Sequence, residues 1–185
     1  MKAKHIFAIV VATMFAAPLF AGGSDSGSGK PVYFLRAEAA WAPVLDDVSG
    51  GYIDDGMSEL NVRFGRDFWY GFPLRADIEA HYSSSVIAGG ASQLCLVGAG
   101  SSLQATLTWR NVLVGSGPAC GYEMIRYDGI AYHGWYVRWD AFAELSLNEY
   151  SRLGLCGGPK VWSNHFTLVD PFIGYRIGAY LGLGF

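Results

Sequence analysis

Charged residues are scarce in this chain, making up only 16% of its 185 residues, against roughly a quarter in ordinary soluble domains. The formal net charge is −3, so the composition gives no indication of a nucleic-acid partner. Apolar runs of about 18 residues, which a membrane-spanning helix needs, are missing beyond residue 20. The chain has instead 51% hydrophobic residues, 15% aromatic residues and 25 glycines. It is therefore apolar overall, yet it predicts no mature transmembrane helix.

The first 21 residues have the pattern of a secretory signal peptide. Lys2 and Lys4 precede an apolar run over residues 6–20, and the small residues Ala21 and Gly22 follow. We expect cleavage after Ala21, with an uncleaved anchor helix as the alternative. Cleavage would leave 11 basic and 16 acidic residues, a net charge of −5.

The mature chain divides into two parts of unequal length. Residues 22–30 are rich in glycine and serine and are expected to form a flexible tail. Residues 31–185 form the remaining domain, which is long enough for one compact unit.

Most of this domain alternates between apolar and polar residues with a period of two, which is typical of amphipathic strands. Six segments follow the pattern clearly: residues 33–41, 59–65, 74–82, 103–110, 135–147 and 177–185. Residues 119–127 and 151–157 are weaker candidates, while residues 113–134 lack a clean strand. No segment of useful length has a helical period. The sequence predicts an all-β fold, an antiparallel up-and-down barrel of about eight strands.

Alternation alone does not separate two kinds of barrel. A soluble lipocalin-like barrel buries its apolar face, whereas a transmembrane barrel turns that face to lipid and its polar face inward. Here the polar face carries charges of both signs on neighbouring strands, and such charges can pair inside a narrow barrel. The predicted interior charge network consists of Arg36, Glu38, Arg63, Arg75, Asp77, Glu79, Arg138, Asp140, Glu144 and Arg176.

Aromatic residues gather at two levels if the first strand starts on the periplasmic side. One level holds Tyr33, residues 68–72, Trp109, Tyr150 and Phe185; the other holds Trp41, Tyr82, Tyr132 and Trp135. Two such girdles mark the interfaces of a membrane barrel.

The connections between the predicted strands alternate in length. Residues 42–59 and 83–102 read as long loops, and residues 67–73 and 115–118 read as short turns. Long external loops and short periplasmic turns are typical of transmembrane barrels.

The last strand keeps its alternation to the end of the sequence. Its outward set is Ala179, Leu181, Leu183 and Phe185. This pattern resembles the C-terminal signal that outer-membrane barrels present to their insertion machinery. We therefore expect these four residues to act as an insertion signal, with Phe185 also anchoring the strand at the interface.

Residues 71–82, "GFPLRADIEAHY", resemble the third strand of small barrels of the opacity-protein and OmpA-like superfamily. Arg75, Asp77, Glu79 and Tyr82 carry the likeness, which the signal peptide and the last strand extend over most of the chain. The resemblance implies an outer-membrane barrel of a Gram-negative bacterium.

Signals for chemistry are weak. Ser163 and His165 lie together in "WSNHF", and His81 lies on a charged strand face. A lipid A-modifying barrel enzyme would need a Ser activated by a His with a third orienting group, and the expected motif order is missing. These three residues are the candidate catalytic residues, and the pattern favours a protein that is not an enzyme.

The remaining polar features indicate neither a metal nor a cofactor. The first loop is acidic, but its acids lack the spacing of a calcium loop, so we expect it to be solvated; they are Asp46, Asp47, Asp54, Asp55 and Glu59. Three cysteines in an oxidising compartment allow one disulfide. If one forms, we expect Cys95 with Cys156, both toward the outer side, with Cys120 as a small buried hydrophobe.

The interior of an eight-strand barrel is just wide enough to be filled by side chains, so a general porin is disfavoured. We expect Arg36, Glu38, Arg138 and Tyr180 to plug it. The predicted function is structural or a surface interaction, such as envelope integrity or adhesion. The predicted partners are outer-membrane lipids, lipopolysaccharide, the insertion machinery, periplasmic chaperones and a surface ligand of the long loops. The alternatives are the lipid-modifying enzyme and a soluble periplasmic lipocalin-like binder.

Overall fold

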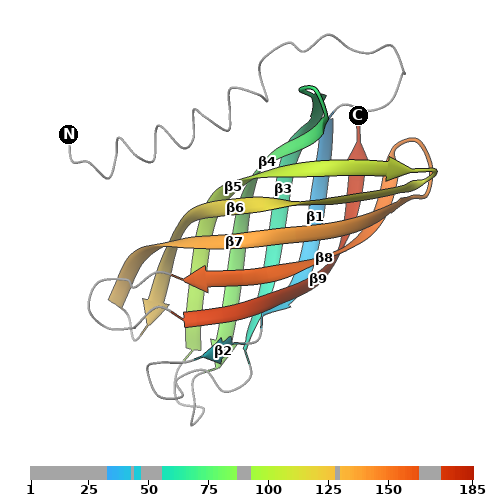
Figure 1. Cartoon of the computed structure of the whole chain (residues 1–185). Coiled ribbons are helices and arrows are strands. Elements are labelled where there is room, and N and C mark those ends of the chain that lie inside the picture. Colours follow the sequence, from blue (N-terminus) through green and yellow to red (C-terminus); the bar gives the residue numbers. More distant parts are fainter. Residues whose placement is uncertain (1–32, 43, 47–55, 87–92, 128–129, 163–171) are drawn as a thin grey trace.

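The computed structural model describes residues 33–42, 44–46, 56–86, 93–127, 130–162 and 172–185 (Figure 1). The strands are β1 (Tyr33–Ala42), β2 (Val44–Asp46), β3 (Met57–Trp69), β4 (Pro73–Val86), β5 (Gln93–Trp109), β6 (Val112–Tyr127), β7 (Ile130–Ser146), β8 (Ser151–Trp162) and β9 (Phe172–Gly184). None of the described residues forms a helix long and apolar enough to cross a membrane.

The strands form one closed antiparallel barrel. Their order around the wall is β1-β3-β4-β5-β6-β7-β8-β9, and β9 pairs back with β1, from Phe34 opposite Gly184 to Trp41 opposite Ile177. The short β2 continues the course of β1 along β9. The wall therefore has eight strands in up-and-down order, which confirms the predicted fold class.

The two ends of the barrel differ. The end called here the turn end holds Tyr33 and Phe185, whose backbones exchange two hydrogen bonds of 3.0–3.1 Å. The connections at residues 70–72, 110–111 and 147–150 lie at the same end. The opposite end, called here the loop end, is where β1 stops at Ala42 and β6 stops at Tyr127. Figure 1 shows this arrangement, with β1 beginning and β9 ending at the turn end.

Strands β5 and β6 correct two sequence-based predictions. The predicted long loop at 83–102 is mostly strand, because β4 runs to Val86 and β5 begins at Gln93. The predicted turn at 115–118 lies inside β6, and the actual turn is Arg110–Asn111, between Trp109 and Val112. Arg110 adopts a φ of 56° there, the left-handed conformation that a two-residue hairpin needs. The segment 113–134, read as lacking a clean strand, contains most of β6 and the start of β7.

The wall is apolar outside and polar inside. Leu60, Leu155, Ile177 and Leu181 are more than 60% exposed, whereas Arg75, Asp77 and Arg176 are fully buried. Apolar side chains facing outward over the whole wall suit a lipid environment and would be unfavourable in water. This orientation contradicts the soluble lipocalin-like alternative, which requires the apolar face inside.

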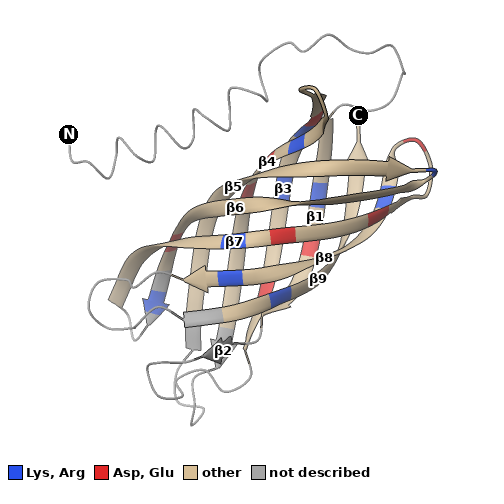
Figure 2. Cartoon of the chain, viewed as in Figure 1, with Lys and Arg blue, Asp and Glu red and all other residues tan. Residues whose placement is uncertain are grey.

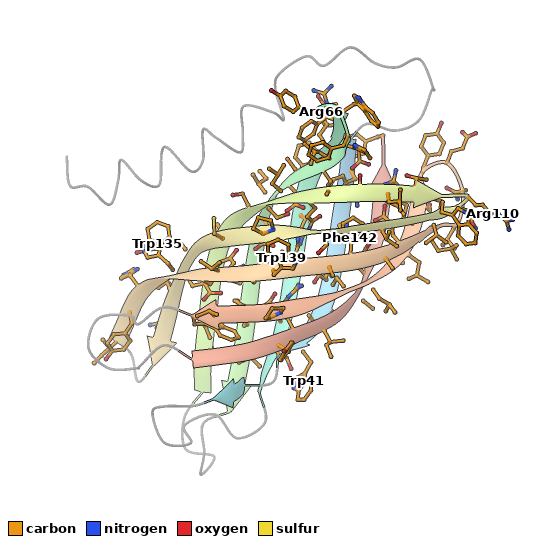
Figure 3. The ribbon with its side chains drawn as sticks, viewed as in Figure 1. Trp41, Arg66, Arg110, Trp135, Trp139 and Phe142 are labelled. Carbon is orange, nitrogen blue, oxygen red and sulfur yellow. The ribbon has the colours of Figure 1, made fainter. Side chains whose placement is uncertain are left out.

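Exposed aromatic residues lie at both ends of the outer wall. Trp69, Tyr70, Trp109 and Tyr150 are more than half exposed at the turn end. Trp41 and Trp135 lie at the loop end, and Figure 3 shows them far from Arg66 and Arg110 at the opposite end. These are the two levels that the sequence predicted from strand order, but the prediction is wrong for Tyr132, which packs against the buried cluster inside the barrel.

The ladder is interrupted in two places beside Trp139. The β5–β6 pairing skips Leu103 and Gln104, which lie opposite Gly117 and Pro118. The β7–β8 pairing skips Trp139 and Asp140, which lie opposite Pro159 and Gly158. Proline has no N–H to give to a ladder, so the two prolines account for both gaps. The exposed indole of Trp139 donates a hydrogen bond to Ser116 Oγ at 2.8 Å.

Candidate functional site

The interior of the barrel is the polar centre of the molecule. Among the described residues it buries six cations and seven carboxylates: Arg36, Arg63, Arg75, Arg138, Lys160 and Arg176, with Glu38, Glu59, Asp77, Glu79, Glu123, Asp140 and Glu144. Basic and acidic residues alternate along neighbouring strands in Figure 2. The partly buried Arg152 adds a further cation to this set, and mixed signs are needed here because a buried unpaired charge would cost several kcal/mol.

Near the turn end, the carboxylate of Glu144 in β7 forms ion pairs with three cations from other strands. This carboxylate lies 3.0 Å from Arg75, 2.8 Å from Arg152 and 3.5 Å from Arg36. Arg75 also donates two parallel hydrogen bonds to Asp67, at 2.6 and 2.9 Å. This fork geometry is the strongest form of an arginine–carboxylate pair. The cluster joins strands β1, β3, β4, β7 and β8.

Aromatic rings fill the space around these guanidinium groups. The guanidinium of Arg36 lies 3.8 Å from the ring centroid of Tyr180, and that of Arg75 lies 4.3 Å from the ring of Phe34. The ring of Phe142 lies within 5.0 Å of both cations. A side chain at Gly154 would collide with the ring of Tyr180, so the glycine there makes room for this stack of rings and cations.

At mid-height, Glu79 of β4 is the common acceptor. It accepts hydrogen bonds from Arg138, from the Tyr136 hydroxyl and from Asn61 Nδ2, the last at 2.9 Å. Arg63 Nε lies 3.2 Å from the same carboxylate. Asp140 then bridges the two arginines, at 2.9 Å from Arg63 and 2.7 Å from Arg138. The centre of the barrel is thus crossed by a continuous ion-pair network.

The third cluster lies toward the loop end. Arg176 is paired with Glu38 and lies 2.5 Å from Glu59. Lys160 lies 2.5 Å from Glu123 and 3.5 Å from Glu59. His81 Nε2 lies 2.7 Å from the same Glu123 oxygen.

The structure places all ten residues of the predicted interior charge network inside the barrel, each with a charged partner. Their partners include residues that the sequence analysis missed or misread. Glu59 was assigned to a solvated loop, and this is wrong, because it belongs to β3 and is 2% exposed. Glu123 and Lys160 were missed because β6 and the end of β8 carry little clean alternation. Asp67 and Arg152 were missed because they lie beside the turns.

The predicted disulfide is wrong. Cys95, Cys120 and Cys156 are all free thiols. Cys156 faces the interior and donates a hydrogen bond to Glu38 at 2.9 Å. Cys95 lies on the outer face, 3.4 Å from the hydroxyl of the exposed Tyr82. Residues on opposite faces of a sheet cannot be bridged without moving the backbone. Cys120 is half-buried.

The described interior offers charge neutralisation but no assembled nucleophile. His81 contacts a carboxylate, and Ser83 and Ser102 donate hydrogen bonds to Glu59 and Asp77. No group of His, Cys, Asp and Glu among the described residues has the arrangement of a metal site. Ser163 and His165 lie outside the described residues, as do Asp47, Asp54 and Asp55 of the first loop. The lipid-modifying alternative therefore stays a prediction.

The four residues of the predicted insertion signal lie on the outer wall of β9 and beyond its end. Leu181, Leu183 and Phe185 are more than half exposed. The ring of Phe185 stacks near those of Tyr33 and Phe64, at centroid distances of 6.3 and 6.2 Å. The aromatic side chain that follows β9 thus contacts β1 and β3 at the turn end.

No protein-family model and no curated protein sequence matches this chain significantly. Several solved structures share its fold, and two of them are compared with it below. Neisserial surface protein A matches with a TM-score of 0.65 and 12% sequence identity, over 83% of this chain and 97% of its own. The outer-membrane enzyme PagL matches with a TM-score of 0.53 and 10% identity, over 78% of this chain and 97% of its own.

Identities this low establish the fold alone. The chain has the closed eight-strand architecture of small outer-membrane barrels. The resemblance inferred from residues 71–82 is confirmed at this level.

Proposed function

We propose that this chain is an outer-membrane protein with a structural or surface-interaction role, in which a filled barrel anchors loops at the cell surface. The observation that carries the proposal is the interior network. Glu79, Arg63, Arg138 and Asp140 cross the centre of the barrel, and all four are at most 4% exposed. A barrel filled in this way holds its shape in the membrane without offering an open aqueous path.

The apolar outer wall supports the membrane location. Lipid supplies no hydrogen-bond partners, so a spanning sheet must close on itself, and β9 closes on β1 here. We propose the orientation from the connections: short turns are typical of the periplasmic side, so we expect the turn end there and the loop end outside.

Export and assembly complete the proposal. Cleavage after Ala21 would give a mature chain that begins at Gly22, a point that N-terminal sequencing of the purified protein tests directly. Periplasmic chaperones and the barrel-insertion machinery would then recognise the outward residues of β9. Adhesion, as in opacity-type proteins, is the surface role that this architecture suits.

Two measurements test the proposal. In the first, the outer-membrane fraction is run in SDS with and without boiling, and we expect a heat-dependent mobility shift because a closed ladder resists detergent. In the second, purified folded protein in planar bilayers should show no steady conductance, with a wide porin as the positive control. A stable open channel in the wild-type protein would contradict the filled interior.

The surface role needs a cellular comparison. A strain lacking the chain is compared with one producing it, by leakage of a periplasmic enzyme and by attachment to host-cell or matrix surfaces. We expect at least one of the two properties to change. If leakage and attachment are both unchanged, the proposed role is wrong, although the barrel architecture is unaffected by this result.

A further inference from the structure

One basic side chain lies on the outer wall, at the loop end of β6. Arg126 is exposed, and no other strand side chain that the structure describes is both charged and exposed. Arg126 is the residue before the last one of β6, which ends at Tyr127. Arg126 forms no ion pair with a described carboxylate; the buried acids are on the inner side of the wall and are paired with other cations.

A histidine lies beside this arginine on the same face. Arg126 is opposite Ala131 in the β6–β7 ladder, and Met124 is opposite His133. Arg126 and His133 are therefore diagonal neighbours, a relation that brings long side chains within reach of each other. His133 is exposed as well.

Aromatic rings continue this surface away from the loop end. The ring of His133 stacks on that of Tyr122, with 5.8 Å between centroids and 20° between planes. The ring of Trp135 meets Tyr122 edge-on at 5.3 Å. Figure 3 shows Trp135 near the loop end of the barrel. On the other flank, Cys95 is opposite Arg126 across β5 and β6.

The position of this surface decides which ligand it suits. Tyr and Trp side chains mark the headgroup level of a bilayer, so Arg126 lies at or just above that level, with the rings below it. Arginine binds phosphate through two parallel N–H donors. The neighbouring imidazole can supply a further N–H, and the rings present flat faces to a sugar or to the first methylenes of an acyl chain.

We propose that Arg126 and His133, with Tyr122 and Trp135, form a binding site for the phosphorylated sugar headgroup of a glycolipid in the outer leaflet. The site rests on the proposed function for its membrane location and for its orientation, which put the loop end in the outer leaflet. The occupant is chosen by charge complementarity: an exposed cation that pairs with no described carboxylate, at headgroup depth and next to aromatic rings, fits a phosphosugar lipid.

The test uses the folded full-length mature protein in a phosphate-free detergent, titrated with diphosphorylated lipid A and read by native mass spectrometry. Arg126→Gln is compared with Arg110→Gln, which is the matched control. Arg110 is also exposed and also lies beside a tryptophan, with its guanidinium 5.0 Å from the Trp109 ring, but it lies at the turn end. We expect Arg126→Gln to weaken binding roughly five-fold, the effect of about one cation near a charged lipid surface.

Three arms separate the outcomes. Arg110→Gln should bind like the wild type, and fully dephosphorylated lipid A should erase the difference between Arg126→Gln and the wild type. Inorganic phosphate at matched concentration should not compete. Equal binding by all three proteins, equal weakening in both variants, or displacement by inorganic phosphate would each overturn the site.

The same samples report the proposed architecture separately. Every variant is first run with and without boiling, so a missing heat shift in the wild type counts against the membrane barrel and not against the lipid site. His133→Gln gives a second check, with a smaller loss expected than for Arg126→Gln. A loss confined to His133→Gln would contradict the assignment of Arg126 as the main phosphate ligand.

Discussion

Glu79 of β4 and Arg138 of β7 form an ion pair through the middle of the barrel, although three strand positions separate them around the wall. The same carboxylate accepts hydrogen bonds from Tyr136 and Asn61. Contacts of this kind brace opposite parts of the wall against each other, which the ladder alone cannot do.

Replacing Glu79 by Gln should therefore destabilise the barrel by about 3 kcal/mol or more, because Arg63 and Arg138 would stay buried with one shared charge removed. The measurement is a urea titration of the protein folded in lipid vesicles, in which the folded fraction is read from the heat-dependent mobility shift. Glu149→Gln, at an exposed turn position, serves as the charge-matched control and should unfold like the wild type.

A double variant checks the cause. Glu79→Met with Arg138→Met removes both charges, and its loss of stability should be smaller than the sum of the two single losses. Additive losses would mean that the two side chains do not act as a pair.

Ser116→Ala should destabilise the wall by about 1 kcal/mol, because the indole N–H of Trp139 would lose its acceptor in lipid. The loss should vanish in a Trp139→Phe background, which has no N–H to satisfy. Urea titrations of the four proteins form a double-mutant cycle. If Ser116→Ala lowered the stability equally in both backgrounds, the Ser116 hydroxyl would not act through its hydrogen bond with Trp139.

Phe185→Ser tests the predicted insertion signal. We expect less heat-shiftable protein in the outer membrane of producing cells, because the substitution removes the terminal aromatic side chain of the outward set. The backbone hydrogen bonds between residues 185 and 33 do not depend on the ring, so purified Phe185→Ser should still refold in vesicles. If purified Phe185→Ser failed to refold but reached normal levels in the outer membrane, the ring would be needed for folding and not for the insertion signal.

Maleimide labelling should distinguish the cysteines by their exposure. In the folded protein a maleimide reagent should reach Cys95 at the rim but not Cys156, which is 7% exposed inside the barrel. Boiling in SDS should expose all three. Electrophoresis of the unfolded chain should give the same mobility with and without reductant. A faster non-reduced band would indicate a disulfide and contradict the separation of Cys95 and Cys156.

The sequence predicted the barrel well where side chains alternate strongly. Residues 74–82 and 135–147 carry large apolar groups on one face and charges on the other, so both the strand and its polar side were predicted correctly. The mixed-sign charges pointed inward because an apolar outer wall leaves them no other face.

Prediction failed where the alternation is carried by small residues. In β5 and β6, glycine and serine occupy inward positions such as Gly98, Ser102 and Gly121, where opposing rings and ion pairs take the space. Segments rich in glycine and serine have the composition of loops, so this part of β5 was predicted as a loop and residues 119–127 of β6 were a weaker strand candidate. The Gly117–Pro118 pair was interpreted as a turn because both residues are typical of turns, but β6 continues through it, and the two residues opposite in β5 are left out of the ladder.

The partners in the interior could not be assigned from sequence for a geometric reason. Which strands face each other across the lumen depends on the stagger of the closed sheet, and one residue of stagger exchanges inward and outward faces. His81 could thus be placed on a polar face, but its contact with Glu123 required the register of β4, β5 and β6.

The shared carboxylates have a consequence for how such a sequence can diverge. Glu144 serves Arg36, Arg75 and Arg152 together, and Glu79 serves Arg63 and Arg138. Reversing one pair of charges would leave the remaining partners facing a like charge. Over evolutionary time, these positions should change in linked sets of three or four rather than in pairs, while outward apolar residues drift independently of one another.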